Sequence, residues 1–306
     1  MGGYALLSTA RALEQGAPTG LVEAAAVVVQ VPPGPVPDAS AAVRGEVGGR
    51  SLVALGGGRV IDAGKAIAAT DGLRVAAIPT TLAGSAFTPF HRLPAGVEGV
   101  SMLRPVLAVC DPQLMASAAL PGLAATAMNA LAHAVEALYA PGANPIAEGA
   151  ALRSAALFAR GLPADPPVRA DIALAAVLAG WAVGTTGLAV HHALCQTIVR
   201  VAGTPHAATN AVMLPHSVAF MADRAPREIG RLAQALGAPG PDPAAASGPV
   251  AVLAAHAGPR TLRELGVERH GLDAVVASAL AHPGLPATPG GVSSAELRAL
   301  LARASA

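Results

Sequence analysis

Residues that could bind a metal or move a proton recur between positions 129 and 216, in stretches otherwise rich in Ala and Leu. Asn129 and His133 are four residues apart, so a helix would place them on one face. His192 follows a long uncharged stretch, His206 comes 14 residues later, and His216 follows in Leu-Pro-His. Burying several imidazoles without partners costs free energy, so the pattern favours a functional site over simple packing. It also suits a metal centre, whereas any one of these histidines alone could be a satisfied core residue.

A glycine turn at 56–58 follows a strand-like run and precedes a helical pattern, in the stretch LVALGGGRVIDAGK (52–65). Glycines let the backbone approach a phosphate closely, and the first turn of a helix offers free N–H groups and a favourable dipole. The stretch IPTTLAGSAFT (78–88) adds hydroxyl groups after the next predicted strand. Because ligands of open α/β sheets bind at the carboxyl ends of strands, the two loops together predict a pyrophosphate site. A glycine turn can also be a simple tight connection.

The predicted elements change in character near residue 112. Before it, apolar runs alternate with helical stretches, which implies βαβ units and a parallel sheet. The predicted strands are 5–9, 25–31, 51–55, 74–78 and 106–110. A helical stretch with Arg11 and Glu14 follows the first strand, and further helices are predicted at 38–46 and about 60–69. After it, only helical segments are predicted: 113–140, 145–161, 168–198, 207–222, 226–236, 248–256, 259–265, 271–281 and 293–304. We therefore predict an α/β Rossmann-like N-terminal domain (1–112) and an all-α C-terminal domain (113–306) that carries the histidines.

The composition excludes several classes of partner. A formal net charge of +1 gives no long-range field for nucleic acid or anionic membrane, and 2% aromatic residues leave few rings to stack on bases. Two cysteines exclude a disulfide framework and a cysteine-based zinc ribbon. The uncharged stretch 172–190 is long enough to cross a bilayer, but no second span accompanies it, so we interpret it as a buried helix. Without a signal-peptide pattern, we expect a cytoplasmic protein that acts on a small molecule, with no nucleic-acid or membrane partner.

Two sets of motifs resemble a known family. The pattern GGG-x-x-x-D-x-x-K at 56–65, followed by PTT-x-x-GS-x-x-T at 79–88, resembles the nucleotide-binding motifs of the iron-containing alcohol dehydrogenase superfamily. The stretch 128–141 and the His-His-x-Leu-Cys at 191–195 resemble its maleylacetate reductase branch, over about 4–304 of the chain. The resemblance implies a dehydroquinate synthase-like fold and NADH or NADPH as cofactor. The implied cofactor contacts are Gly56, Gly57, Gly58, Asp62, Thr80, Thr81 and Ser8.

The same resemblance assigns roles to the histidine region. In the superfamily an Asp, a His four residues later, and two histidines 14 residues apart hold the metal; those positions are Asn129, His133, His192 and His206 here. The reductase branch also has Asn at the first position and is generally regarded as not needing metal. A neutral amide is a poor replacement for a carboxylate on a divalent cation. We therefore expect these four residues to be catalytic and no metal to be tightly held. If a metal binds, the implied ligands are His133, His192 and His206.

Four positions and one shortened loop, between Phe90 and Pro105, depart from the family pattern; Ala86 stands where the family has an acidic residue. Arg59 replaces a serine after the glycine turn, Ala193 replaces a lysine, and Gln196 replaces a histidine linked to proton transfer. Gln196 is among the expected catalytic residues, although an amide cannot shuttle a proton near neutral pH. Two functions stay open. One is NAD(P)H-dependent hydride transfer to an activated C=C or C=O in a cleft between the domains. The other is a divergent family member without redox activity, either a non-redox enzyme or a partner protein. Relatives are often dimers, so we expect a homodimer.

Overall fold

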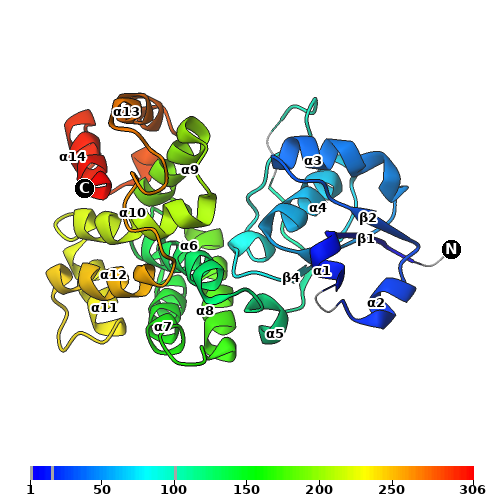
Figure 1. The fold of residues 1–306 in the computed structure, drawn as a ribbon, viewed down its shortest axis with the longest axis horizontal. Coiled ribbons are helices and arrows are strands. Elements are labelled where there is room, and N and C mark those ends of the chain that lie inside the picture. The colour runs from blue at the N-terminus through cyan, green and yellow to red at the C-terminus, as the bar shows by residue number, and fades with distance from the viewer. Residues whose placement is uncertain (1–2, 15–16, 100–101) are drawn as a thin grey trace. The chain divides into compact units, whose positions relative to one another are not determined.

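The chain forms two compact units, Met1–Ser117 and Ala118–Ala306 (Figure 1). The computed structural model describes residues 3–14, 17–99 and 102–306. The sequence places the division after residue 112, whereas the structure places it beyond the short helix α5 (Pro112–Met115), which belongs to the first unit. Leu114 on α5 packs against the first unit's core, which explains the later division.

The first unit contains a five-stranded parallel sheet in the order β2-β1-β3-β4-β5. The strands are β1 (Ala5–Ser8), β2 (Val27–Gln30), β3 (Leu52–Gly56), β4 (Val75–Pro79) and β5 (Leu107–Ala108). In register, Ala5 of β1 lies opposite Leu52 of β3, and Leu52 opposite Val75 of β4. The direction of winding reverses between β1 and β3, and such a switch point is where open α/β sheets bind ligands. The glycine turn leaves β3 at this point.

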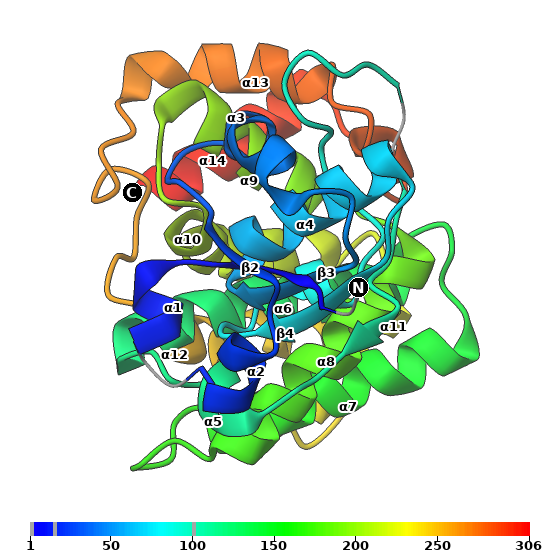
Figure 2. The ribbon, with the colours of Figure 1, turned by 90° about the vertical axis from the view of Figure 1, so that its right-hand side faces the viewer.

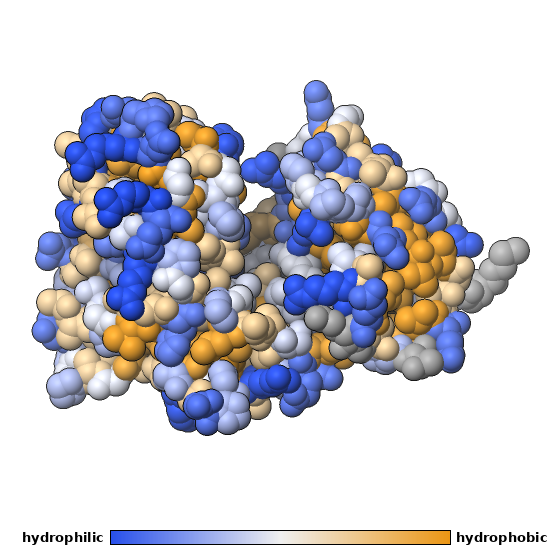
Figure 3. Space-filling view, viewed as in Figure 1, coloured by the Kyte–Doolittle hydropathy of each residue, from blue (hydrophilic) through white to orange (hydrophobic). Residues whose placement is uncertain are grey.

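Helices cover both faces of this sheet (Figure 2). On one face, α3 (Val36–Val43) and α4 (Gly58–Asp71) bury the larger core cluster, and η1 (Arg44–Val47) follows α3. On the other face, α1 (Ala10–Glu14) and α2 (Thr19–Glu23) cover a smaller cluster around Leu6 and Leu55. Helix α2 was not predicted from the sequence. Figure 3 shows hydrophobic side chains gathered over β1 and β2, and Val28 on the edge strand β2 remains 39% exposed.

The second unit is helical and is built around α6 (Leu120–Tyr139), which is buried over most of its length. Helices α7 (Pro145–Gly161), α8 (Arg169–Thr186), α9 (Val190–Ala202) and α10 (His206–Met221) pack against it. The unit is completed by α11 (Pro226–Ala235), α12 (Ser247–Ala255), α13 (Leu272–Leu280) and α14 (Ser294–Ser305). Short 3-10 helices connect them: η3 (Pro243–Ala245), η4 (Arg269–Gly271) and η5 (Leu285–Ala287). Because α6 is buried, every polar side chain it carries must find a partner or a ligand.

The structure corrects three helix predictions. The segment 168–198 is two helices, because α8 ends at Gly187 (φ 93°) and α9 leaves at an angle of 99°. The stretch 172–190 is therefore bent: no helix in the described ranges is long and apolar enough alone to cross a membrane, and only the bent pair α8–α9 passes such a test together. The segment 113–140 is α5 and α6, separated by 116–119, and 259–265 forms turns. His192 consequently lies in the first turn of a helix.

Candidate active site

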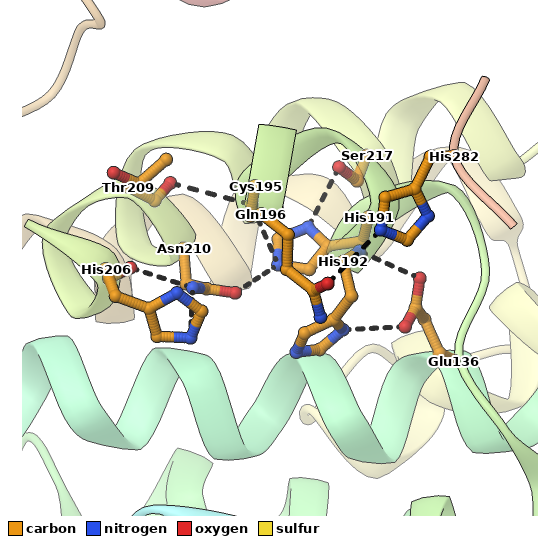
Figure 4. Close-up of polar contacts among 10 residues, drawn as sticks. All are labelled: Glu136, His191, His192, Cys195, Gln196, His206, Thr209, Asn210, Ser217 and His282. Carbon is orange, nitrogen blue, oxygen red and sulfur yellow. Dashed lines mark hydrogen bonds and ion pairs between the residues drawn. The ribbon is translucent and has the colours of Figure 1, made fainter. Parts of the chain in front are cut away.

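Three mutually contacting helices bring the predicted histidines together (Figure 4). Helix α6 supplies Asn129 and His133 on one face, α9 supplies His192 near its start, and α10 begins at His206. Asn129, His133 and His192 are buried, with 7%, 8% and 2% of their surface exposed. Such burial is rare for polar side chains, so the partners of each atom decide what the site can do.

Glu136 holds His192 in place. The Glu136 carboxylate is fully buried; its Oε2 lies 2.6 Å from Nδ1 of His192, and its Oε1 accepts from the His192 backbone nitrogen at 3.2 Å. The backbone N–H groups of Ala189 and His191 also donate to it. Helix α9 has no side-chain cap of its own, so a carboxylate from α6 satisfies the N–H groups at its start. With Glu136 ionised, Nδ1 of His192 carries the proton and Nε2 offers a lone pair.

His133 and His192 are stacked, with ring centroids 4.5 Å apart and planes inclined by 7°. Three buried atoms at this place have no hydrogen-bond partner among the described residues: Asn129 Oδ1, His133 Nδ1 and His192 Nε2. Leaving a buried polar atom unsatisfied costs about 1–3 kcal/mol. Three such atoms on adjacent side chains therefore mark a place that a bound molecule completes.

His191, next to His192, has a different role. Its Nε2 lies 2.9 Å from Asn210 Oδ1 and its Nδ1 lies 3.0 Å from Ser217 Oγ, so both ring nitrogens are paired. The side chain is fully buried, and Cys195 Sγ lies 3.6 Å from its Nε2. His191 is therefore a satisfied core histidine that joins α9 to α10.

His206 lies at the edge of the cluster and is exposed. Asn210 Nδ2 donates to the His206 carbonyl at 2.8 Å and lies 3.4 Å from its Nε2. His206 is close enough that its charge lowers the pKa of both His133 and His192. His216 lies elsewhere on α10, in a cavity of about 460 Å³ lined also by residues of α12, so it is not part of the cluster.

Burial controls protonation in this cluster. Desolvation, followed by the charges of neighbouring histidines, lowers the pKa of His133 well below its ordinary value and that of His191 to about 3. Desolvation likewise lowers the pKa of His192 and raises that of Glu136, whose backbone donors oppose the shift. The three buried imidazoles are therefore neutral at pH 7, so they act through hydrogen bonds and not as cations.

The residues at the family's metal positions do not fit a metal ion. A metal lies near the plane of each imidazole that binds it, because the nitrogen lone pair lies in that plane. The stacked, nearly parallel rings of His133 and His192 share no such point. Asn129 adds only a neutral amide. Within the described ranges, no group of three or more His, Cys, Asp or Glu side chains could hold a metal ion. No step below involves a metal.

In the first unit, the glycine turn fits a phosphate. Helix α4 begins at Gly58 with no side-chain cap, and Val60 and Ile61 donate to the Gly57 carbonyl, so the N–H groups of Gly58 and Arg59 are the ones available. A Cβ at Gly57 would lie 3.2 Å from Cγ2 of Thr81, and one at Gly58 would lie 3.1 Å from Oγ of Ser85. The glycines therefore allow the threonine-bearing loop to pack directly against the start of α4.

A buried ion pair, which we call the Lys65 clip, ties α4 to this loop. Lys65 Nζ lies 2.8 Å from Asp62 Oδ1 and donates to the carbonyls of Ser85, Thr88 and Phe90 at 3.1, 3.2 and 2.6 Å. Ser85 Oγ donates to Asp62 Oδ2 at 3.1 Å. Desolvation lowers the pKa of the fully buried Lys65, and the Asp62 charge opposes that shift. Asp62, expected to contact the cofactor, is thus occupied in shaping the loop.

The remaining predicted cofactor contacts divide into two groups. The backbone N–H of Thr80 donates to the Gly56 carbonyl at 3.0 Å, and the Thr80 and Thr81 side chains are half-buried beside the glycine turn. Ser8 is fully buried, and its hydroxyl donates to the Leu55 carbonyl at 2.8 Å. Ser8 therefore joins β1 to β3, and its hydroxyl is used within the sheet instead of facing a ligand.

Comparison with known proteins defines the class. The Fe-containing alcohol dehydrogenase C-terminal domain matches residues 123–305, and the iron-containing alcohol dehydrogenase domain matches residues 21–116. The chain belongs to the iron-containing alcohol dehydrogenase family. This confirms the predicted family and, with the structures below, the predicted fold.

Within that family, the chain is similar to maleylacetate reductases. Maleylacetate reductase 1 of Rhodococcus opacus is 39% identical over 234 residues, 72% of this chain and 64% of the relative. The maleylacetate reductase of Sphingobium indicum is 37% identical over 267 residues, 84% of this chain and 74% of the relative. The crystal structure of maleylacetate reductase from Agrobacterium tumefaciens has a TM-score of 0.84 at 30% identity, covering 99% of this chain and 90% of that one. The chain thus spans just under two thirds of the length of the first of these relatives.

Sequence reasoning missed two residues around the site. Glu136 is the only charged residue of α6 and lies three residues after His133, so its spacing and isolation were a usable signal. His282, which bonds Gln196, follows α13 in a Gly- and Pro-rich stretch, 86 positions from its partner. No local pattern links two such distant residues.

Proposed function

We propose that this protein is an NAD(P)H-dependent reductase that acts on a substrate resembling maleylacetate, at an activated C=C or C=O. The observation that carries the proposal is the group of three unpartnered buried atoms on Asn129, His133 and His192. The similarity to maleylacetate reductases and the uncapped start of α4 at the sheet's switch point support it. A bound nicotinamide would supply the hydride.

The side chains of the cluster bind and orient the substrate. His192, held by Glu136, offers a lone pair at Nε2, and Asn129 offers Oδ1, so both accept hydrogen bonds. No hydrogen bond among the described residues fixes the tautomer of His133, which leaves it able to donate an N–H to an oxygen that gains charge as hydride arrives. A neutral imidazole is suited to that role because it stabilises charge without first losing a proton. We assign the hydrogen bond to that oxygen to His133, which keeps its proton, and delivery of the proton to the exposed His206 at the edge of the cluster.

The first unit binds the cofactor in this proposal. The backbone of Gly57 and Gly58, at the start of α4, receives the pyrophosphate, and Thr80 and Thr81 line the adjoining loop. Asp62 acts through the Lys65 clip, which fixes the loop that the glycines pack against. The alternative, a family member without redox activity, is motivated by Arg59, Ala193 and Gln196.

Nucleotide binding separates these two functions. The purified protein is titrated with NADH and NADPH, and binding is followed by nicotinamide fluorescence and by thermal shift. We expect saturable binding of at least one of them, followed by loss of reduced nicotinamide absorbance when maleylacetate is added. Failure of both nucleotides to bind at millimolar concentration would leave the non-redox function as the better account. Metal analysis of the purified protein, expected to show no stoichiometric metal, tests the metal conclusion independently.

A further inference from the structure

Gln196 lies on α9 one turn after His192, and a histidine from a distant segment binds its side-chain oxygen. His282 Nε2 lies 3.2 Å from Gln196 Oε1. Helix α13 packs against α9, and η5 also contacts it, so the turn between α13 and η5 places His282 beside Gln196 (Figure 4). This contact was not foreseen from the sequence.

The surroundings of His282 determine which ring nitrogen carries its proton. The backbone N–H of Gly284 donates to Nδ1 at 3.0 Å, so Nδ1 is an acceptor. A neutral imidazole with an unprotonated Nδ1 carries its proton on Nε2. Desolvation, followed by the charge of Arg200, lowers the pKa of His282, which favours the neutral ring, although Glu136 opposes this. The ring is also closely confined, because a Cβ at Gly284 would lie 3.3 Å from Nδ1.

The proton on Nε2 in turn determines the orientation of the Gln196 amide. A donor must face an acceptor, so Gln196 presents Oε1 to His282 and its NH2 group points the other way. Figure 4 shows that amide nitrogen on the side of the His192 ring, away from His282. In the hydrogen-bond series from Gly284 N–H through His282 to Gln196, the Gln196 amide therefore turns its two neutral N–H groups away from His282. Gln196 lies one helical turn after His192, whose Nε2 has no partner among the described residues.

We infer that the Gln196 amide binds an oxygen of the substrate, and that His282 is a positioning residue that fixes the orientation of that amide. The inference rests on the proposed reductase function and narrows its substrate class. Ala193, buried on the same helix, supplies no cation. An oxygen bound here therefore meets neutral donors only, which suits a carbonyl oxygen better than a second carboxylate, since a carboxylate is bound most strongly by charged donors.

Two substitutions at one position test the role of His282. His282→Gln keeps an N–H donor close to the place of Nε2, whereas His282→Met removes it with little change in size. We expect His282→Met to raise KM for the carbonyl substrate about 10-fold, the effect of losing about one hydrogen bond, with an unchanged Kd for NADH. His282→Gln should restore a KM within about twofold of wild type. Gln196→Glu, which replaces the NH2 group with an acceptor, should raise KM at least as much as His282→Met.

The exposed His270, which pairs with Glu268 at the surface, provides the control substitution His270→Gln, expected to change neither constant. Equal KM values for His282→Met and His282→Gln, or an unchanged KM in Gln196→Glu, would overturn the inference. A readout independent of turnover is the ¹⁵N NMR spectrum of the histidine rings, with His282 assigned by its loss in His282→Gln. A proton on Nε2 is expected, and a proton on Nδ1 would overturn the inference. If the wild-type protein oxidises no reduced nicotinamide, the proposed function fails, while the NMR result still decides the orientation.

Discussion

The two candidate binding regions satisfy their buried polar groups in opposite ways. Around the glycine turn, the polar side chains pair with the protein itself: Ser8 with Leu55, and Lys65 with Asp62 and three carbonyls. The groups that remain available to a ligand around the glycine turn are backbone N–H groups at the start of α4. Around α6, adjacent buried side-chain atoms of Asn129, His133 and His192 have no hydrogen-bond partner among the described residues. This difference supports the proposal that the first region holds a phosphate group through its backbone and that the second contacts a reacting molecule through side chains.

The largest effect is expected from the substitution His192→Ala. If the side chains near α6 contact the reacting molecule, kcat should fall about 10²-fold, the order expected when a group that orients the reacting molecule is lost. The Kd for NADH should stay within about twofold, because the cofactor is bound by the other unit. Steady-state kinetics and fluorescence titration measure the two constants. His216→Ala, outside the cluster, is the control. If His192→Ala weakened NADH binding by the same factor as it lowered kcat, His192 would be a structural residue.

Removing the Lys65 clip tests whether the first region depends on internal pairing. Lys65→Met leaves the Asp62 carboxylate and three carbonyl oxygens without their cation. Because Asp62 is partly exposed, the main cost is the loss of a buried donor to the three carbonyls, and the free energy of unfolding in urea should fall by about 1–3 kcal/mol. The control is Arg44→Met, whose ion pair with Asp71 lies at the surface and should contribute little. Similar losses in the two variants would contradict the role assigned to the clip.

A change at Gly57 tests backbone recognition. The Cβ of Gly57→Val would press on Thr81 and obstruct the first N–H groups of α4. We expect the Kd for NADH to rise about 10- to 100-fold, the loss of one or two hydrogen bonds to a charged group. Gly20→Ala is the matched control, since a Cβ there meets nothing within 4 Å. Unchanged nucleotide affinity in Gly57→Val would remove the glycine turn from the cofactor site.

A smaller effect concerns the pH dependence of stability. The pKa of His191 is about 3 in the folded protein and near 6.5 when unfolded, so between these values only the unfolded chain binds this proton. The stability contributed by the neutral, buried His191 is fully present above pH 6.5. It is lost as the pH falls from 6.5 towards 3, because the unfolded chain binds the proton first. The slope is at most about 1.4 kcal/mol per pH unit for one group. His191→Gln should reduce the slope of unfolding free energy against pH by about this amount, and His270→Gln should not. Equal slopes in wild type and His191→Gln would contradict the assigned pKa.

Local patterns predicted much of the fold. Short apolar runs ended by Gly or Pro located β2, β3 and β4, and the glycine turn located the start of α4, because these features depend on neighbours in the sequence. The break at Gly187 was missed, since Ala- and Gly-rich residues on both sides fit one continuous helix. It follows from tertiary contacts: Glu136 on α6 satisfies the start of α9 only after the chain has turned.

The sequence predicted which residues form the candidate site, but not which of their atoms pair with one another. The spacing of Asn129 and His133, together with the family resemblance, identified the residues near α6. Neither the spacing nor the resemblance could show that the Ser8 hydroxyl donates to the Leu55 carbonyl, or that His282 binds Gln196. Both contacts join segments far apart in the sequence. The stacking of His133 on His192, which argues against a metal centre, is likewise a property of packing between two helices.

The central claim is that this protein transfers hydride from a reduced nicotinamide to a substrate. The most direct measurement uses NADH deuterated at the transferable position of the nicotinamide ring, incubated with the protein and maleylacetate, and determines the product's isotopic mass. The account predicts one deuterium in the product for each nicotinamide oxidised, and a correspondingly slower appearance of that product with His192→Ala. Oxidation of the nicotinamide without deuterium in the product, or binding of the nucleotide without any oxidation, would contradict it.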